Sequence, residues 1–149
     1  MKRSNIILLI ILWLPTSING QSIKLKKGDK LWSLGEKFVE ARNELHDQKR
    51  IEFVSEIFSG GQEFHEDINS FLRDLLSSGG KFIPHSFFSV GRGSAIHIVG
   101  EEVQTGVWMR YQLGLVIKEH TKIGLLAQTP SRKPKKLPAG GISKLAVKN

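Results

Sequence analysis

The sequence predicts an α+β fold, because its hydrophobic pattern changes once along the chain. Apolar residues between Leu31 and Leu76 recur at the spacing of amphipathic helices, whereas those between Phe82 and Ala127 alternate with polar residues, as in strands. The chain has 149 residues, of which 40% are hydrophobic. That is enough for the core of one small domain. We therefore expect a set of helices followed by strands within one compact body.

Residues 1–20 have the three parts of a secretory signal. Lys2 and Arg3 precede an uninterrupted apolar run at 6–14, and a proline and small residues follow. The run is shorter than the roughly 20 residues that span a bilayer. We expect export to the periplasm or cell envelope, either with cleavage of the segment or with its retention as a membrane tether. A buried N-terminal strand or helix is the alternative.

A short strand and a first helix are expected at the start of the exported chain. Residues 22–27 alternate apolar and lysine side chains, which predicts a half-exposed strand, and Gly28 ends it. Asp29 is placed to cap the following helix, because its carboxylate can accept hydrogen bonds from free backbone N–H groups at the positive end of the helix dipole. The apolar stripe of this helix comprises Leu31, Leu34, Phe38, Ala41 and Leu45.

Two further helices are expected after a short polar break. A second amphipathic stripe runs over residues 51–58 and stops at Gly60-Gly61, since glycine commonly ends helices. A third helix is predicted from about Ile68, with Asp67 as its cap. The Ser77-Ser78-Gly79-Gly80 segment should end it.

The strands predicted beyond residue 80 differ in length. Short strands are expected at 82–83 and 95–99, and the longest alternation covers 106–118, with 123–127 as its hairpin partner. One face of the long strand carries Val107, Met109, Tyr111, Leu113, Leu115 and Ile117, and the other carries Trp108, Arg110, Gln112 and Lys118. Trp108 is placed either to stack on a sugar ring or to be covered by one of the helices.

The positive charge lies at the two ends of the chain. The net charge is +8, but all 14 acidic residues lie between Asp29 and Glu119, and residues 21–129 are neutral as a whole. The basic tail at 130–149 suits anionic lipid headgroups or wall polymers, or it is simply solvated. The secretory leader argues against nucleic acid as a partner. The absence of cysteine excludes disulfides, thiol nucleophiles and thiolate metal sites.

No catalytic or metal-binding pattern is visible, so we expect neither an enzyme nor a cofactor. Glu101 and Glu102 are neighbours in a predicted strand and should face opposite sides, which does not suit a catalytic pair. The histidines lack the spacing of metal ligands. They stand at His46, His65, His85, His97 and His120.

The segment Lys26-Lys27-Gly28-Asp29-Lys30-Leu31-Trp32-Ser33-Leu34, which follows an alternating strand, resembles the opening of a LysM domain. The resemblance is closest over residues 23–39. Residues 90–99 look like a loose version of the strand that closes such a domain. Lys30 replaces the threonine of the family motif, and Ser59 stands where an asparagine commonly ends the second helix.

The resemblance implies a strand-helix-helix-strand unit at residues 21–100 that is enlarged by an inserted helix. It requires the strand at 23–25 to pair antiparallel with residues 96–98. The remaining segments are a signal peptide or signal anchor at 1–20, a β-hairpin extension at 101–129 and a disordered basic tail at 130–149.

The resemblance also implies a function. The protein would be a non-catalytic bacterial envelope protein that binds peptidoglycan, a polymer containing N-acetylglucosamine, in a shallow groove between two loops. The alternative is an envelope protein-interaction or assembly module that keeps the fold without binding glycan. The implied ligand-binding residues are Gly28, Asp29, Lys30 and Leu31 in the first loop and Phe58, Ser59, Gly60 and Gly61 in the second.

Overall fold

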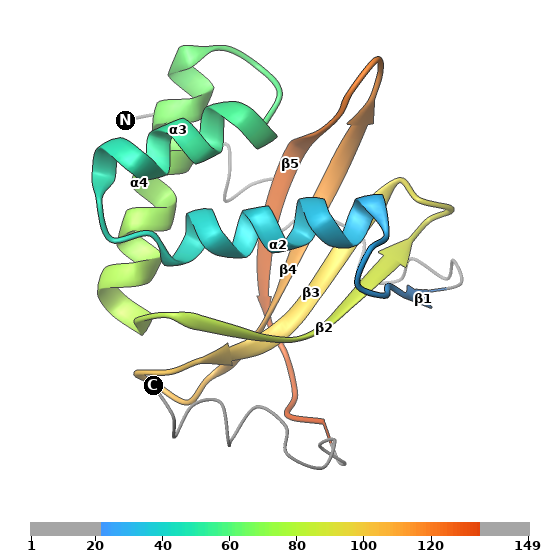
Figure 1. The fold of residues 1–149 in the computed structure, drawn as a ribbon. Helices are drawn as coiled ribbons and strands as arrows, with labels where there is room; N and C mark the ends of the chain where they lie inside the picture. Colours follow the sequence, from blue (N-terminus) through green and yellow to red (C-terminus); the bar gives the residue numbers. More distant parts are fainter. Residues whose placement is uncertain (1–21, 135–149) are drawn as a thin grey trace.

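The computed structural model describes residues 22–134, which form three helices and five strands (Figure 1). In chain order the elements are β1 (Ile23–Lys24), α2 (Lys30–Asn43), α3 (Asp47–Ile57), α4 (Gln62–Gly79), β2 (Phe82–Val90), β3 (Ala95–Glu102), β4 (Trp108–Ile117) and β5 (Thr121–Pro130). The predicted α+β class is confirmed. The predicted leader and most of the predicted basic tail lie outside the described residues.

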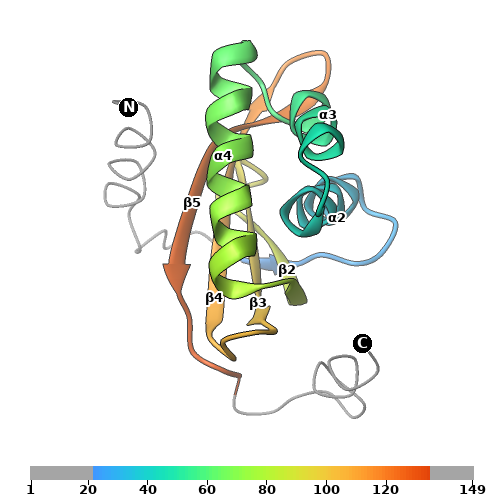
Figure 2. The same ribbon diagram turned by 90° about the vertical axis from the view of Figure 1, so that its left-hand side faces the viewer.

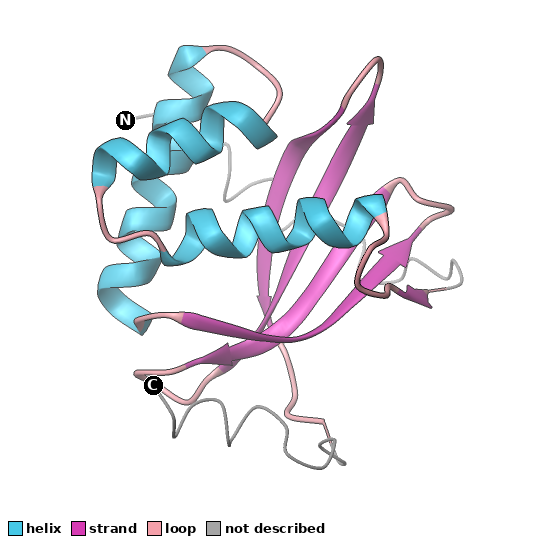
Figure 3. Ribbon diagram, in the orientation of Figure 1, coloured by secondary structure: helices cyan, strands magenta, loops and turns pink. Residues whose placement is uncertain are grey.

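The five strands form one antiparallel sheet in the order β1-β2-β3-β4-β5. The three helices lie on one face of this sheet (Figures 1 and 3). Helix α2 crosses the strands, whereas α4 runs roughly parallel to the long axes of β4 and β5 (Figure 2). The predicted hairpin therefore continues the same sheet as the preceding strands.

The expected pairing of residues 23–25 with 96–98 is wrong. Strand β1 pairs with β2, with Ile23 opposite Ser89 and Lys24 opposite Phe88. The physical reason is that β2 is longer than its sequence suggests and continues through Pro84. Proline cannot donate a hydrogen bond, but it is tolerated in strands near a sheet edge. Strand β2 thus lies between β1 and β3.

Two helix starts differ in detail from the sequence prediction. Asp29 is the N-cap of α2, but its carboxylate does not cap the helix and instead accepts a 2.9 Å hydrogen bond from the Lys26 backbone N–H. Helix α4 begins at Gln62, well before Ile68. Its added first turn packs Phe64 against the core, with the ring centroid 6.3 Å from that of Phe58. The contact between Phe64 and Phe58 therefore stabilises the first turn of α4, for which the sequence has no strong helix-start signal.

The hydrophobic core fills the space between the helices and the inner face of the sheet. The predicted apolar face of β4 is confirmed at Met109, Tyr111 and Leu113, which are buried, and Leu115 is partly buried. It is wrong at its two ends, because Val107 and Ile117 are exposed. Trp108 lies on the opposite, outer face, where its ring centroid is 5.7 Å from that of His85. Helices α2, α3 and α4 all lie on the opposite face (Figures 1 and 2), so the expectation that one of these helices covers Trp108 is wrong.

A buried arginine joins α2 to three other parts of the fold. Arg42, which is fully buried, donates hydrogen bonds to the Tyr111 hydroxyl at 2.7 Å and to the Gly80 carbonyl at 2.9 Å. It also forms an ion pair with Glu102 at 3.3 Å. Thr105 donates a further hydrogen bond to the same carboxylate. The guanidinium therefore has a partner on each of its nitrogens.

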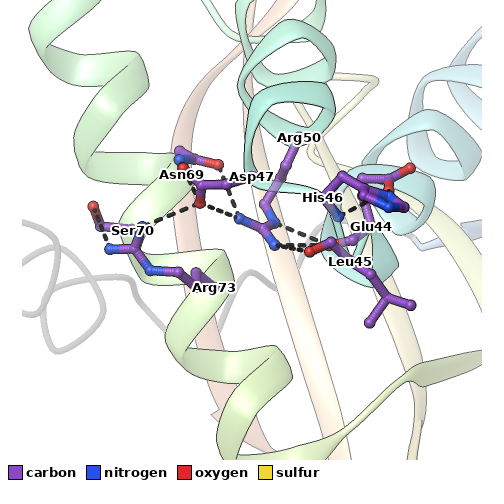
Figure 4. A network of polar contacts seen from close by, with 8 residues as sticks. All are labelled: Glu44, Leu45, His46, Asp47, Arg50, Asn69, Ser70 and Arg73. Atoms are coloured by element: carbon purple, nitrogen blue, oxygen red, sulfur yellow. Dashed lines mark hydrogen bonds and ion pairs between the residues drawn. The ribbon is translucent and has the colours of Figure 1, made fainter.

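A second buried arginine organises the α2–α3 connection (Figure 4). Arg50 donates to the Glu44 carbonyl and to the Asp47 carboxylate at 2.8 Å. Asn69 and Arg73 of α4 donate to the same Asp47 oxygen. Burial opposes ionisation of Asp47, but these hydrogen bonds outweigh it and lower its pKa from 3.8. The network ties α4 to the first turn of α3.

Replacing Arg42 tests how much its contacts with Tyr111, Gly80 and Glu102 contribute to stability. Arg42→Met should lower the free energy of unfolding by about 3–5 kcal/mol, because it leaves the buried Glu102 carboxylate without its counter-charge. The measurement is urea unfolding followed by circular dichroism. Lys37→Ala is the control, because Lys37 lies on α2 like Arg42 but forms an exposed ion pair with Glu56 of α3. Its loss should lower the free energy of unfolding by at most about 1 kcal/mol. Equal losses in the two variants would contradict a special role for Arg42.

Tyr111 is the only tyrosine of the chain, so its ionisation can be followed directly. Burial raises the pKa of Tyr111 above its ordinary 10.0, and the nearby Arg42 charge only partly offsets this. Below pH 10 both the folded and the unfolded states keep the proton. Above it the unfolded state loses the proton first, so stability should fall as pH rises.

We expect tyrosinate absorbance to appear together with loss of tertiary structure in an alkaline titration. Near-ultraviolet absorbance and circular dichroism measured on the same samples check this. Ionisation of Tyr111 in a fully folded protein at its ordinary pKa would contradict it.

Candidate functional site

The first predicted ligand loop lies at the start of α2. Gly28, Asp29 and Lys30 are exposed, and Leu31 is partly buried against the core. A positive φ of 103° at Gly28 allows the tight turn between β1 and α2, which a side chain would strain. The Lys26 carbonyl closes this turn by accepting a hydrogen bond from the Asp29 backbone N–H.

The second predicted loop uses most of its polar groups internally. The Ser59 backbone N–H and hydroxyl both donate to the Ile123 carbonyl of β5. A ring nitrogen of His65 contacts the carbonyls of Phe58 and Ser59 at 3.0 and 3.1 Å. The Phe58 side chain is in the core, whereas Gly60 and Gly61 are exposed. No hydrogen bond or ring contact joins this loop to the first one within the described part of the chain.

An open groove lies beside the first loop, between α2 and the β1–β2 edge of the sheet. It has a volume of about 710 Å³. Its lining comprises Lys24, Leu25, Trp32, Glu36, Val39, Glu40, Asn43, Pro84, His85, Ser86 and Phe87. We call it the α2–β2 groove. It contains Trp32 and a row of polar side chains.

Trp32, Glu36 and Glu40 occupy successive turns of one face of α2, because residues four apart lie above one another in a helix. Trp32 is partly exposed and rests on the Phe87 ring at a centroid distance of 5.7 Å. Both glutamates are exposed. The groove therefore offers an aromatic surface followed by two hydrogen-bond acceptors.

Close packing of α2 on β2 forms the floor of the groove. A Cβ built at Gly35 would lie 2.7 Å from the Phe87 ring, which is closer than two carbon atoms can pack. Only glycine therefore lets α2 approach β2 this closely. The position of Trp32, one turn before Gly35, depends on this approach.

The exposed edge of β2 is protected against pairing with another strand. The Asn43 carboxamide donates to the Phe82 carbonyl and accepts from the Phe82 N–H, as a neighbouring strand would. Pro84 has no N–H to offer, and a register shift between Pro84 and Ser86 interrupts the edge. Such features block edge-to-edge association. The groove therefore suits a ligand bound mainly through side chains and the remaining free backbone groups.

His85, at this register shift, faces both the groove and the outer face of the sheet. Its ring Nδ1 is hydrogen-bonded with the Ser86 hydroxyl. Burial, and secondarily the positive charge of Lys24, lower the pKa of His85 below its ordinary 6.5. The ring is therefore neutral at pH 7 and can either donate or accept a hydrogen bond.

The groove contains polar residues that the sequence motif did not identify. Glu36 and Glu40 could have been found, because they follow Trp32 at helical spacing on an exposed face. No local signal marked His85 or Asn43, since both enter the groove through pairing of segments far apart in the chain. The sequence pattern predicts Lys24 only as part of a half-exposed strand.

The described residues contain no group of three or more His, Asp or Glu side chains arranged to hold a metal ion. None of the helices in the described part of the chain is long and apolar enough to cross a membrane. No protein-family model matches the sequence, and neither the curated proteins nor the solved structures include a significant match.

A substitution at Gly35 tests the close packing beneath the groove. Gly35→Ala gains about 1 kcal/mol of helix propensity but should lose about 1–3 kcal/mol through overpacking against Phe87. We therefore expect a net loss of up to about 2 kcal/mol, measured by urea unfolding, and a changed Trp32 environment in fluorescence. Ser33→Ala, at an exposed position of the same helix, should leave both unchanged. A Gly35→Ala protein with higher stability and unaltered fluorescence would contradict the model of the groove.

Proposed function

We propose that this chain is an exported, non-catalytic envelope protein that binds peptidoglycan in the α2–β2 groove. The observation that carries the proposal is the partly exposed Trp32 beside the exposed Glu36 and Glu40 in an open groove. An aromatic face packs against the C–H groups of a sugar ring, and carboxylates accept hydrogen bonds from its hydroxyl and N-acetyl N–H groups. A pyranose polymer satisfies both requirements.

The ligand class rests on the LysM-like motif, in which Trp32 and the adjacent Gly28–Leu31 loop belong to one continuous segment. As part of the proposal, β1, α2, α3 and β2 are a LysM-like strand-helix-helix-strand unit with α4 inserted before its second strand. This version differs from the one that the sequence predicts, because β1 pairs with β2, so residues 82–90 take the place of 96–98 as the closing strand. The exposed Lys30 would contact a peptide carboxylate of the wall, as an addition to the groove contacts.

Binding at a single groove should be weak. Each hydrogen bond to an uncharged group contributes about 0.5–1.5 kcal/mol net, and part of this is lost in ordering the ligand. A polymer with many repeats compensates by presenting many equivalent sites, and a second contact raises the effective concentration. The basic tail would supply such a contact with anionic wall polymers or lipid headgroups.

The proposed role is binding without hydrolysis. Glu36 and Glu40 are both exposed on one helix face. A glycosidase needs a desolvated carboxylic acid on one side of the scissile bond and a second carboxylate on the other. Two exposed glutamates one turn apart on one helix do not provide that pair of environments.

Co-sedimentation with purified peptidoglycan tests the proposal. Wild-type protein should co-sediment at high salt, and Glu36→Gln with Glu40→Gln should reduce the bound fraction by about fivefold, the equivalent of roughly one net hydrogen bond. Trp32→Ala should reduce it further, with a thermal melt to confirm folding. Glu52→Gln, at an exposed site of α3 outside the groove, is the matched control and should bind like wild type.

Removal of residues 132–149 separates the groove from the tail, because it deletes every base of the tail and keeps β5 and the Ser131 N–H that donates to the Trp108 carbonyl. Binding that survives this removal and high salt supports the groove. Binding that disappears with the tail assigns it to electrostatics. Folded protein that never sediments with peptidoglycan favours the alternative role, in which the domain docks onto another envelope protein. Release of soluble glycan fragments would contradict the non-catalytic assignment.

A further inference from the structure

The outer face of the sheet, away from the helices and the core, carries a second group of polar side chains. His85, His97, Trp108, Arg110 and Gln112 project from β2, β3 and β4, and we call them the outer-face cluster. His97 lies directly opposite Gln112 in the β3–β4 register. Arg110 is two residues from Gln112 and two from Trp108, so all three share one face of β4.

Four polar atoms of this cluster are buried without a hydrogen-bond partner. They are His85 Nε2, His97 Nε2, Arg110 Nε and Gln112 Oε1. Leaving a buried polar group unpaired costs about as much as losing a hydrogen bond, so native structures contain few such atoms. All four unpaired buried atoms found among the described residues belong to this one cluster. Three of them, on His97, Gln112 and Arg110, belong to neighbouring positions of β3 and β4, whereas His85 lies beside Trp108 at the other end of the row. The three neighbouring atoms point to a ligand that supplies their missing partners.

The charge of the cluster indicates an anion. Arg110 is partly buried and forms no ion pair with any acidic side chain of the described residues, in contrast to Arg42 and Arg50. Burial, and then the Arg110 charge, lower the pKa of His97 below 6.5, so the guanidinium is the only full charge that the cluster presents at pH 7. One planar guanidinium matches the geometry of a carboxylate.

Gln112 restricts the ligand further. Its unpaired atom is an acceptor, which requires a donor on the ligand close to the anionic group. The dianion of a phosphate monoester has no such donor, whereas an amide N–H next to a carboxylate provides one. Arg110 and His97 are partly exposed, which leaves a route from solvent, while Gln112 and Trp108 are almost fully buried and form the base.

We propose that the outer-face cluster binds the carboxylate and adjacent amide N–H of an N-acylated amino acid, with Arg110 and His97 on the carboxylate and Gln112 on the N–H. The Trp108 ring supports the ligand from the side of His85. Glu36 and Glu40 lie on the helix side of the sheet, away from this site. The outer-face proposal and the proposed binding of peptidoglycan in the groove can therefore be disproved independently.

Ligand-observed nuclear magnetic resonance with the full chain tests the site, using N-acetylglycine as the probe. Acetate, N-acetylglycinamide and methyl phosphate are the comparison compounds. N-acetylglycine should bind best, acetate more weakly, and the uncharged amide and phosphate weakest. Tighter binding of N-acetylglycylglycine than of N-acetylglycine would identify a peptide end as the source of the group. Binding of the amide as tight as that of N-acetylglycine would overturn the proposal.

Arg110→Gln should weaken N-acetylglycine binding by about tenfold or more, the usual effect of losing a charge-assisted contact. Arg92→Gln, which removes the same charge at the exposed turn between β2 and β3, should not change it. Gln112→Leu should reduce N-acetylglycine binding to the level of acetate while leaving acetate itself unaffected.

Stability provides an independent readout for these variants. Removing an unpaired buried group does not destabilise a fold, so Arg110→Gln and Gln112→Leu should melt no lower than wild type. A large loss of stability in both variants would show that the residues have a structural role and would overturn the proposal. Glu36→Gln with Glu40→Gln should leave N-acetylglycine binding intact, which distinguishes this site from the groove.

Discussion

The ion pair between Arg42 and Glu102 is the interaction on which the arrangement of this fold depends. Arg42 is fully buried, and its guanidinium reaches the end of α4, strand β3 and the Tyr111 hydroxyl of β4. A charge in such a place is tolerated only when every donor has a partner. Gly79 is part of the same constraint, because a Cβ there would lie 2.3 Å from the Glu102 carboxyl carbon. The helix layer and the sheet are therefore held in one relative position.

That fixed position creates the two sites. Helix α2 carries Arg42 near its end and Trp32 near its start, so anchoring the helix across the sheet also places the α2–β2 groove along its length. Asn43, the residue after Arg42, closes the edge of β2 and ends the groove. On the other side of the sheet, none of the three described helices covers the polar residues (Figure 2). The outer-face cluster consequently has the unpaired atoms that the inner face lacks.

The contrast between the arginines is informative about function. Arg42 and Arg50 are fully paired within the chain, and both hold elements together. Arg110 is partly buried in the same domain without a partner among the described residues. Only the Nε of Arg110 is a buried atom without a partner, and the proposed outer-face site rests on this atom together with those of His97 and Gln112.

The sequence by itself determined the helical and strand periodicities, the α+β class and the buried middle of β4, because those depend on neighbours in the chain. It also marked the turn at Gly28 and the motif around Trp32. Only the tertiary structure decided that β1 pairs with β2, that α4 starts at Gln62 and that His85 lies beside Trp108. Strand partners and buried polar contacts join residues distant in sequence, and their choice depends on the packing and hydrogen bonding of the whole fold. Local periodicity contains no information about that choice.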